Sequence, residues 1–251
     1  MEPTTPSLAN KVVLVTGAAQ RVGSVIVRTL HAEGMNVLLH YRSSKREAQA
    51  MYDEIHGWRK DSVALGQADL LHAERLPELV QQAIDMWGRL DVLVNNASSF
   101  YPTPVGTVTT DQWEELLGSN VKAPFFLAQA AAPHLAETSG CIVNIADIYA
   151  DRPLRSYPVY SIAKAAVVMM TKALARELAP KVRVNAVAPG AILWPETDMD
   201  DVTKQRIISR TFLKRQGSPE NIARAVLFLI RDADYTSGQV INVDGGRSLN
   251  A

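Results

Sequence analysis

The sequence predicts an α/β fold, a doubly wound parallel sheet of about seven strands with helices on both faces. Short apolar runs rich in Val, Ile and Leu alternate with longer amphipathic runs, which is the pattern of a parallel sheet flanked by helices. The run Val92-Leu93-Val94 is apolar at every position, as in a central strand that is buried on both faces. Polar and glycine-containing residues follow the ends of such runs, as at Thr16-Gly17.

The first half of the chain is expected to contribute alternating strands and helices. The strands are β-branched or apolar runs, and two of the helical patterns stop at Gly34 and Gly88, residues suited to a helix end. In chain order the expected elements are strand 12–15, helix 22–33, strand 36–41, helix 43–58, strand 63–65, helix 73–87 and strand 91–97.

The second half continues the alternation, with helix ends marked by capping residues. Asp111 is the expected N-cap of a helix that is interrupted at Pro124, and Ser218 is the expected N-cap of a helix with Pro219 at its first position. The expected elements are helix 111–134, strand 141–147, helix 157–178, strand 182–188, helix 218–230 and strand 239–243. The segment 191–216 is irregular by pattern and is expected to be a substrate loop. No linker or repeat interrupts residues 1–251, which predicts one domain.

Composition excludes several classes of partner. The chain has 26 basic and 26 acidic residues and no net charge, so nothing favours nucleic acid or an anionic membrane as a partner. The single cysteine, Cys141, cannot form an internal disulfide, and no apolar run approaches the roughly 20 residues of a membrane-spanning helix. The first ten residues show no signal-peptide pattern. We therefore expect a cytoplasmic protein.

The polar residues at the strand ends predict a ligand site. In doubly wound sheets the ligand lies beyond the carboxyl ends of the strands, near the point where the strand order reverses. The expected strand ends carry Tyr41-Arg42, Asp69, Asn95-Asn96-Ala97, Asp147 and Pro189-Gly190.

The turn between the first strand and the first helix is suited to a pyrophosphate. Gly17 permits a sharp turn, Gly23 lets the helix approach the sheet, and the helix N-terminus offers N–H groups to phosphate. Any tight strand-to-helix turn can contain two glycines, so its place in the first strand–helix–strand unit carries the interpretation. Arg21 adds a guanidinium that can hold phosphate and reach a substrate acceptor.

The end of the second strand favours NADPH over NADH. The residues there are His40, Tyr41, Arg42, Ser43 and Ser44, with no carboxylate to accept hydrogen bonds from a ribose 2′-hydroxyl. An arginine and two hydroxyls at the start of a helix suit a phosphate dianion. The alternative is an ordinary basic helix start.

Tyr160 and Lys164 lie four residues apart in an expected helix and so share one face. An ammonium close to a phenol lowers the pKa of the phenol, which predicts that Tyr160 exchanges protons near neutral pH. The alternative for an isolated pair of this kind is a chance exposed contact.

These motifs together resemble the short-chain dehydrogenase/reductase family across nearly the whole chain, and this resemblance implies a Rossmann-like fold. The residues that carry it are Thr16–Gly23, Asn95-Asn96-Ala97, Asn120, Tyr160, Lys164, Pro189-Gly190 and Val243-Asp244-Gly245-Gly246. Within the family the chain is most similar to the pteridine reductases. The supporting features are Arg21 in place of the middle glycine, His40-Tyr41, the run from Asn95 to Pro104, and Asp147 where most relatives have the catalytic serine.

The resemblance implies a role for each matching position. Tyr160 relays a proton and works with Asp147 in protonating a pterin, Lys164 binds the nicotinamide ribose, and Asn120 holds a water in the relay. Phe100 stacks on the pterin. Ser98 and Arg21 bind substrate and cofactor, Asp69 contacts the adenine end, and Trp194 lines the substrate mouth. The other positions expected at the cofactor are Gly17, Val22, Leu70, Asn96, Ala97, Pro189, Gly190 and Ile192. Relatives are commonly homotetramers.

Three alternative roles remain open for single residues. Phe100 could be a core aromatic, Asn120 could cap or kink its helix, and Asp147 could be a structural N-cap. The remaining histidines lack the spacing of metal ligands, and we assign no metal.

Three functions are compared. The leading one is reduction of a dihydropterin or dihydrofolate, and of the oxidised pterin, by NADPH. The second is a ketone reductase acting on a 3-oxoacyl thioester, which Asp147 disfavours because such enzymes usually keep a serine there. The third is a protein that senses NADPH without chemistry, which Tyr160 and Lys164 disfavour.

Overall fold

Seven strands form one all-parallel sheet in the order β3-β2-β1-β4-β5-β6-β7, which confirms the predicted fold class. The computed structural model describes residues 6–194 and 199–250. The strands are β1 (Val12–Val15), β2 (Asn36–Tyr41), β3 (Val63–Gln67), β4 (Val92–Asn95), β5 (Cys141–Ile145), β6 (Arg183–Pro189) and β7 (Val240–Val243). The strand order reverses between β1 and β4, where a ligand site is expected.

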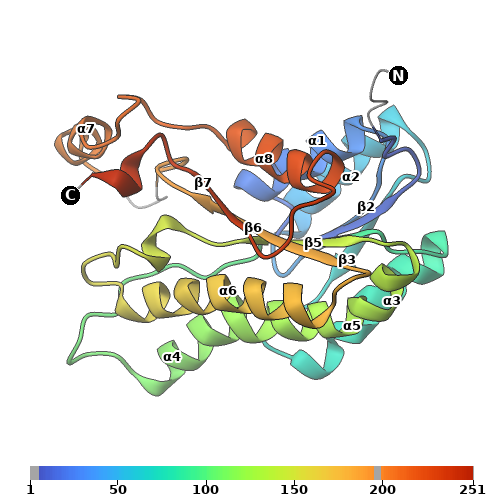
Figure 1. Ribbon diagram of the computed structural model, residues 1–251, viewed down its shortest axis with the longest axis horizontal. Coiled ribbons are helices and arrows are strands. Elements are labelled where there is room, and N and C mark those ends of the chain that lie inside the picture. The colour runs from blue at the N-terminus through green and yellow to red at the C-terminus, as the bar shows by residue number, and fades with distance from the viewer. Residues whose placement is uncertain (1–5, 195–198, 251) are drawn as a thin grey trace.

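Helices cover both faces of the sheet (Figure 1). The α-helices are α1 (Arg21–Ala32), α2 (Lys45–Trp58), α3 (Leu76–Trp87), α4 (Thr110–Leu117), α5 (Ala123–Glu137), α6 (Pro158–Glu177), α7 (Asp201–Ser209) and α8 (Pro219–Arg231). Figure 1 shows α1, α2 and α8 above the sheet and α3 to α6 below it. Short 3-10 turns occur at Ala73–Arg75, Ile148–Ala150 and Arg247–Leu249.

Each face of the sheet packs into its own apolar core. Successive residues of a strand point to opposite faces, so Val13 and Val15 of β1 join the core beneath α1 and α8, while Val12 and Leu14 join the core beneath α3, α5 and α6. Every residue of β1 is buried, as a strand covered on both faces requires.

The helix predicted over 111–134 is divided in the structure. Thr109, rather than the predicted Asp111, is the N-cap of α4: its hydroxyl accepts a hydrogen bond from Gln112 N at 3.2 Å, and the Gln112 side chain accepts one from Thr109 N at 3.1 Å. A π-helical turn, Gly118–Lys122, then separates α4 from α5. The predicted interruption therefore exists and ends just before Pro124.

The prediction that 191–216 is irregular throughout is wrong, because this segment contains α7. Asp200 is the N-cap of α7, where its carboxylate accepts a hydrogen bond from Thr203 N at 2.7 Å. No residue of α7 is buried, so the helix lacks the apolar stripe from which sequence periodicity is detected.

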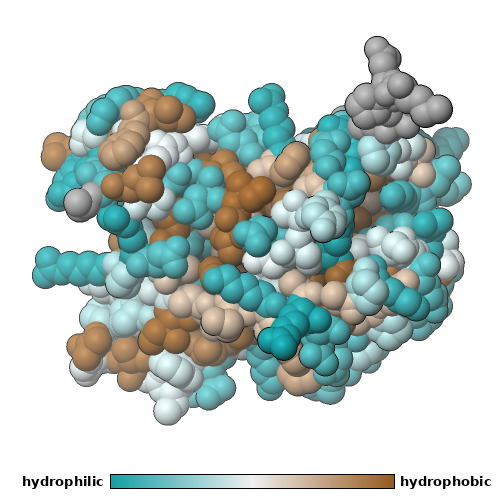
Figure 2. Space-filling model, viewed as in Figure 1, coloured by the Kyte–Doolittle hydropathy of each residue, from teal (hydrophilic) through white to brown (hydrophobic). Residues whose placement is uncertain are grey.

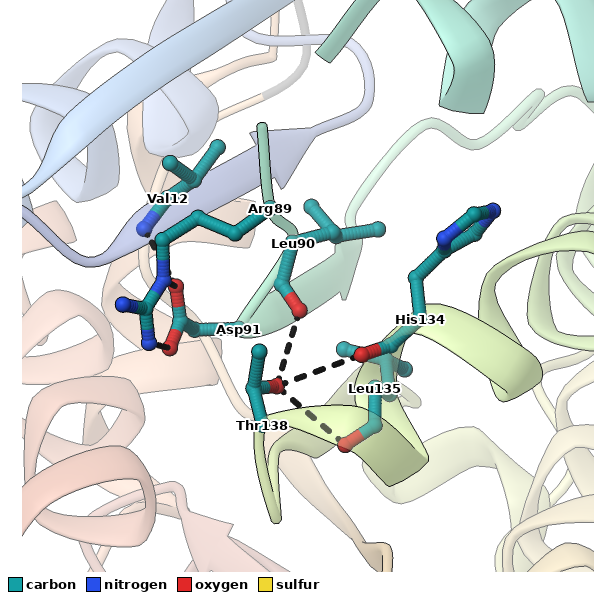
Figure 3. A network of polar contacts seen from close by, with 7 residues as sticks. All are labelled: Val12, Arg89, Leu90, Asp91, His134, Leu135 and Thr138. Carbon is teal, nitrogen blue, oxygen red and sulfur yellow. Dashed lines mark hydrogen bonds and ion pairs between the residues drawn. The ribbon is translucent and has the colours of Figure 1, made fainter. Parts of the chain in front are cut away.

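The amino ends of the strands are closed by a polar network (Figure 3). Asp91, just before β4, accepts hydrogen bonds from Val12 N at 2.8 Å and from the Arg89 guanidinium at 2.9 and 2.6 Å. Beside it, the Thr138 hydroxyl at the end of α5 donates to Leu90 O at 2.9 Å. Each of these polar groups has a partner within the chain, so we expect this edge of the sheet to contribute to stability and not to bind a ligand.

Candidate active site

Asp147, Tyr160 and Lys164 meet at the carboxyl end of β5. The Tyr160 hydroxyl donates a hydrogen bond to Asp147 Oδ2 at 2.8 Å, and Lys164 Nζ donates to Ile145 O at 3.0 Å. Tyr160 and Lys164 come from the buried face of α6, as their four-residue spacing predicts, and are only 4% and 2% exposed. The geometry joins a phenol, a carboxyl group and an amine in one buried site.

Burial shifts the pKa of all three groups. It raises the pKa of Asp147 and lowers the pKa of Lys164 to about 8, which the Asp147 carboxylate partly opposes. Burial also raises the pKa of Tyr160 well above its usual value, and the charge and hydrogen bond of Asp147 add to this rise. The pKa of both members of the Tyr160–Asp147 pair is therefore raised by burial.

The predicted lowering of the Tyr160 pKa by Lys164 is thus wrong in this structure. Lys164 Nζ lies 5.6 Å from the centroid of the Tyr160 ring and donates to a backbone carbonyl, whereas the Tyr160 hydroxyl faces Asp147. The Tyr160 hydroxyl is hydrogen-bonded to the Asp147 carboxyl group and not to the Lys164 ammonium group. A nearby negative charge disfavours phenolate.

Asp147 is both a helix cap and a partner of Tyr160. Its Oδ1 atom accepts a hydrogen bond from Tyr149 N at 2.9 Å, which caps the 3-10 turn, while Oδ2 accepts from Tyr160. The guanidinium of Arg247 opposes the rise in the Asp147 pKa and also lies against Tyr149. Sequence analysis missed Arg247; the only signal was a cation directly after the Gly245-Gly246 pair.

Phe100 lies beside the catalytic candidates and not in the core. Its ring stacks on Tyr157, with centroids 4.6 Å apart, and meets Tyr160 edge-on at 4.8 Å. Phe100 is 41% exposed, so the alternative reading as a core aromatic is wrong. Tyr157 was also missed by sequence analysis, since its distance from Phe100 in the chain hides the contact.

Asn120 lies in the π-helical turn and is buried. Its Nδ2 atom donates to Ser99 O and Leu116 O, both at 3.0 Å, so the side chain helps to hold the irregular turn. Its Oδ1 atom has no hydrogen-bond partner among the residues that the structure describes. A buried carbonyl oxygen of this kind is suited to accept a hydrogen bond from water or a ligand.

The turn after β1 brings the backbone close to the neighbouring strand. Gly17 has φ +59°, and a Cβ atom there would lie 2.8 Å from Ala97 Cα. At Gly23 a Cβ atom would lie 2.2 Å from Gly17 O, so glycine is required at both positions. Asn96 Nδ2 fastens the turn by donating to Thr16 O and Gly17 O, both at 2.9 Å.

Arg21 occupies a left-handed backbone position, with φ +54°. Most residues other than glycine avoid this region, so the backbone is strained at Arg21. The side chain is exposed, and Nη2 donates to Trp194 O at 3.2 Å, so the structure links the turn to the start of the predicted substrate loop. Trp194 makes this contact through its backbone carbonyl and not through its ring. Val22 is partly buried in the first turn of α1, which has no acidic residue.

The five residues at the end of β2 divide into two groups. Arg42 and Ser43 are exposed and Ser44 is partly buried, so these side chains are open to a ligand. His40 and Tyr41 are buried, and the Tyr41 hydroxyl donates to Gln67 at 3.4 Å.

The remaining predicted positions lie along the same rim. Asp69 lines a shallow cleft with Ala68 and Arg75, and its carboxylate accepts from Leu71 N at 3.0 Å. Ser98 is exposed and lies against the Tyr160 hydroxyl. Leu70, Ala97, Pro189, Gly190 and Ile192 are buried or partly buried. The exposed cations, the glycine turn and the acid-free start of α1 fit a nucleotide cofactor with phosphate groups.

Across residues 6–194 and 199–250, no three metal-ligating side chains are grouped, and no helix is long and apolar enough to cross a membrane.

The chain is similar to known reductases over nearly its full length. A family model described as "Enoyl-(Acyl carrier protein) reductase" matches residues 17–248. "Pteridine reductase 1" of Leishmania tarentolae is 37% identical, over 98% of this chain and 98% of that protein. The "3-oxoacyl-[acyl-carrier-protein] reductase FabG" of Staphylococcus aureus is 36% identical, over 94% of this chain and 97% of that protein. The chain belongs to the short-chain dehydrogenase/reductase family and is an NAD(P)-dependent reductase.

Proposed function

We propose that this enzyme uses NADPH to reduce a pterin ring, as in a dihydropterin or dihydrofolate, and also the oxidised pterin. The observation that carries the proposal is the hydrogen bond between Tyr160 and Asp147 at 2.8 Å, in a buried site beside the exposed ring of Phe100. A pterin is planar and must gain a proton on nitrogen. An aromatic ring and a hydroxyl hydrogen-bonded to a carboxyl group supply what such a substrate needs.

The choice of NADPH rests on the side chains at the end of β2. Arg42 and Ser43 are exposed, and Ser44 lies beside them at the start of α2, so these residues would hold a 2′-phosphate. The turn at Gly17 with Arg21 would hold the pyrophosphate, and Lys164 the nicotinamide ribose. Asp69 would meet the adenine end. When bound, NADPH supplies a hydride to carbon.

The protein's own part in the reaction is to deliver a proton and to orient the ring. Burial raises the pKa of Asp147 and of Tyr160, and the two groups share a hydrogen bond, so the pair is suited to pass a proton to a ring nitrogen as hydride arrives at carbon. Asn120 Oδ1, buried and unpaired among the described residues, would hold a water that resupplies the proton. Ser98 and Arg21 would bind the substrate edge, with Trp194 at the mouth of the site.

The second candidate is a carbonyl reductase, which the similarity to a 3-oxoacyl reductase at 36% identity supports. Asp147 separates the two. Reduction of a ketone develops negative charge on oxygen, and a neutral hydroxyl stabilises that charge better than a carboxylate does. A sensor that only holds NADPH would have no use for the Tyr160–Asp147 pair.

We also propose that the chain forms one domain and assembles as a homotetramer. Apolar side chains lie at the surface over the lower layer of helices (Figure 2), and Trp113, Phe125 and Met169 on α4, α5 and α6 are exposed. Exposed apolar patches often mark contacts between proteins. Light scattering at several concentrations tests the assembly.

One assay separates the candidate functions. NADPH oxidation is measured with dihydrobiopterin, dihydrofolate, oxidised pterin and a 3-oxoacyl thioester in parallel. Turnover of a pterin or folate supports the proposal. An enzyme that reduces the ketone well and ignores every pterin would overturn it.

The cofactor assignment has its own test. Arg42→Ala is expected to raise the NADPH dissociation constant by about tenfold to a hundredfold, since a charge-assisted hydrogen bond is worth roughly 1.5–3 kcal/mol. NADH binding should barely change. Equal binding of NADH and NADPH by the unmodified protein would contradict the assignment.

A further inference from the structure

His40 lies on β2 and is buried, and both of its ring nitrogens have hydrogen-bond partners in the turns that follow β1 and β3. Nδ1 accepts a hydrogen bond from Gly17 N at 3.1 Å, and Nε2 lies 3.1 Å from Ala68 O. The ring thus spans from the phosphate turn after β1 to the residue that follows β3. His40 is 2% exposed, so little of the side chain is open to a ligand.

The two partners fix the tautomer of the ring. The Ala68 carbonyl can only accept, so Nε2 carries the hydrogen, and Gly17 N–H can only donate, so Nδ1 is unprotonated. Only a neutral imidazole satisfies both contacts. Burial, the largest influence, lowers the pKa of His40 to about 4, which agrees with this form.

The contact with Gly17 restrains the part of the turn that must present N–H groups to phosphate. Gly17 is in the left-handed region, at φ +59°, and Asn96 fastens its carbonyl from the side of β4. The ring of His40 fastens its N–H from the side of β2, and His40 O accepts from Ala18 N at 2.8 Å. The turn is therefore held from both sides.

We propose that His40 is a positioning residue for the NAD(P) site, which sets the phosphate turn at Gly17 against the end of β3 without touching the cofactor. Ala68 is followed by Asp69, which lies where the adenine end is expected. The imidazole thereby links the two parts of the site that receive the two ends of one nucleotide. This role depends on the family's use of NAD(P) and not on the identity of the reduced substrate.

Two substitutions separate the two halves of the link. The amide oxygen of Asn can take the place of Nδ1 and keep the contact with Gly17, whereas the amide nitrogen of Gln can take the place of Nε2 and keep only the contact with Ala68. We expect His40→Gln to raise the NADPH dissociation constant by about tenfold, the value of one lost hydrogen bond at the turn. His40→Asn should stay within about threefold of the unmodified protein. Turnover at saturating NADPH should change less than twofold in both, by about 0.4 kcal/mol at most.

The matched control is His31, which is also buried and bonds Ser62 Oγ at 2.7 Å, away from the carboxyl ends of the strands. His31→Gln is expected to lower thermal stability and leave NADPH binding unchanged. Unfolding without cofactor is recorded for all three variants. The proposal is overturned if His40→Asn and His40→Gln weaken NADPH binding to the same extent, or if neither variant weakens it.

A measurement on the unmodified protein covers the case in which the variants do not fold. Nitrogen-15 NMR of the His40 ring should show the tautomer with hydrogen on Nε2, retained when NADP⁺ is added. Hydrogen on Nδ1, or a change of tautomer on binding, would overturn the proposal because Gly17 would then have lost its acceptor.

Discussion

Asp91 and Asp147 stand at opposite ends of the neighbouring strands β4 and β5, and they differ in their partners. Asp91 accepts two hydrogen bonds from the fork of Arg89 and one from Val12 N. Asp147 accepts from the Tyr160 hydroxyl and from Tyr149 N. The fork of a guanidinium fixes the position of a carboxylate, whereas a hydroxyl partner can exchange a proton with it.

The two ends of the sheet separate stability from chemistry. At the amino ends of the strands, the polar groups around Asp91 satisfy one another (Figure 3). At the carboxyl ends, Asn120 Oδ1 is unpaired among the described residues, and burial raises the pKa of Asp147 and of Tyr160. Substitutions at the two ends should therefore change different measurements.

The largest effect is expected from Tyr160→Phe. Removing the hydroxyl should lower turnover by about 10²–10⁴-fold, the usual value of general acid catalysis. The ring keeps its packing, so the change is confined to proton transfer. NADPH binding, measured by fluorescence titration, and the unfolding temperature should change little. Near-normal turnover on every substrate of the panel would remove Tyr160 from the chemistry.

At the amino ends of the strands, a substitution is expected to change stability and not turnover. Asp91→Ala leaves the buried Val12 N–H without its acceptor and should lower the free energy of unfolding by about 1–3 kcal/mol. Denaturant unfolding measures this change. Activity per folded molecule should be preserved, and a loss of turnover without a loss of stability would show that the two ends are not separate.

Arg21→Gly sharpens the comparison, since the active-site edge stores strain. Glycine relieves the left-handed backbone at φ +54°, so the variant should gain about 1 kcal/mol in free energy of unfolding. It also loses the contact with Trp194 O, and the KM for the proposed pterin substrate should rise. A variant that is less stable in denaturant unfolding would show that the side-chain contacts of Arg21 outweigh the strain.

The smallest expected effect is the pH dependence of stability at Asp147. Its pKa is raised by folding, so above that pKa the folded protein carries a partly buried carboxylate at a cost, and below the usual pKa of Asp the cost disappears. Asp147→Asn should therefore be more stable than the unmodified protein at neutral pH, and the difference should vanish as the pH falls. Thermal unfolding of both proteins, measured between about pH 3 and 8, follows this difference in stability, because the range extends from below the ordinary pKa of Asp to above neutral pH. A constant difference across the range would mean that charge is not its origin.

Local patterns predicted the fold and part of the site. The strands and the pair Tyr160 and Lys164 were predictable, because apolar runs and a four-residue helical spacing are properties of short segments. The direction in which the Tyr160 pKa shifts was not predictable, since it depends on which group reaches the hydroxyl after α6 packs against the end of β5. The link from His40 to Gly17 and Ala68 joins three separate strands. The helix α7 has no buried residue and so no periodic signal.

The π-helical turn at Gly118–Lys122 makes this part of the chain sensitive to length more than to composition. A π-helical turn contains one residue more than an α-helical turn, so deleting one residue from it would let an α-helix run on from α4 into α5. Asn120 would then lose the backbone position from which it donates to Ser99 O. A single-residue deletion in this turn should therefore leave the two helices folded and still disturb the site.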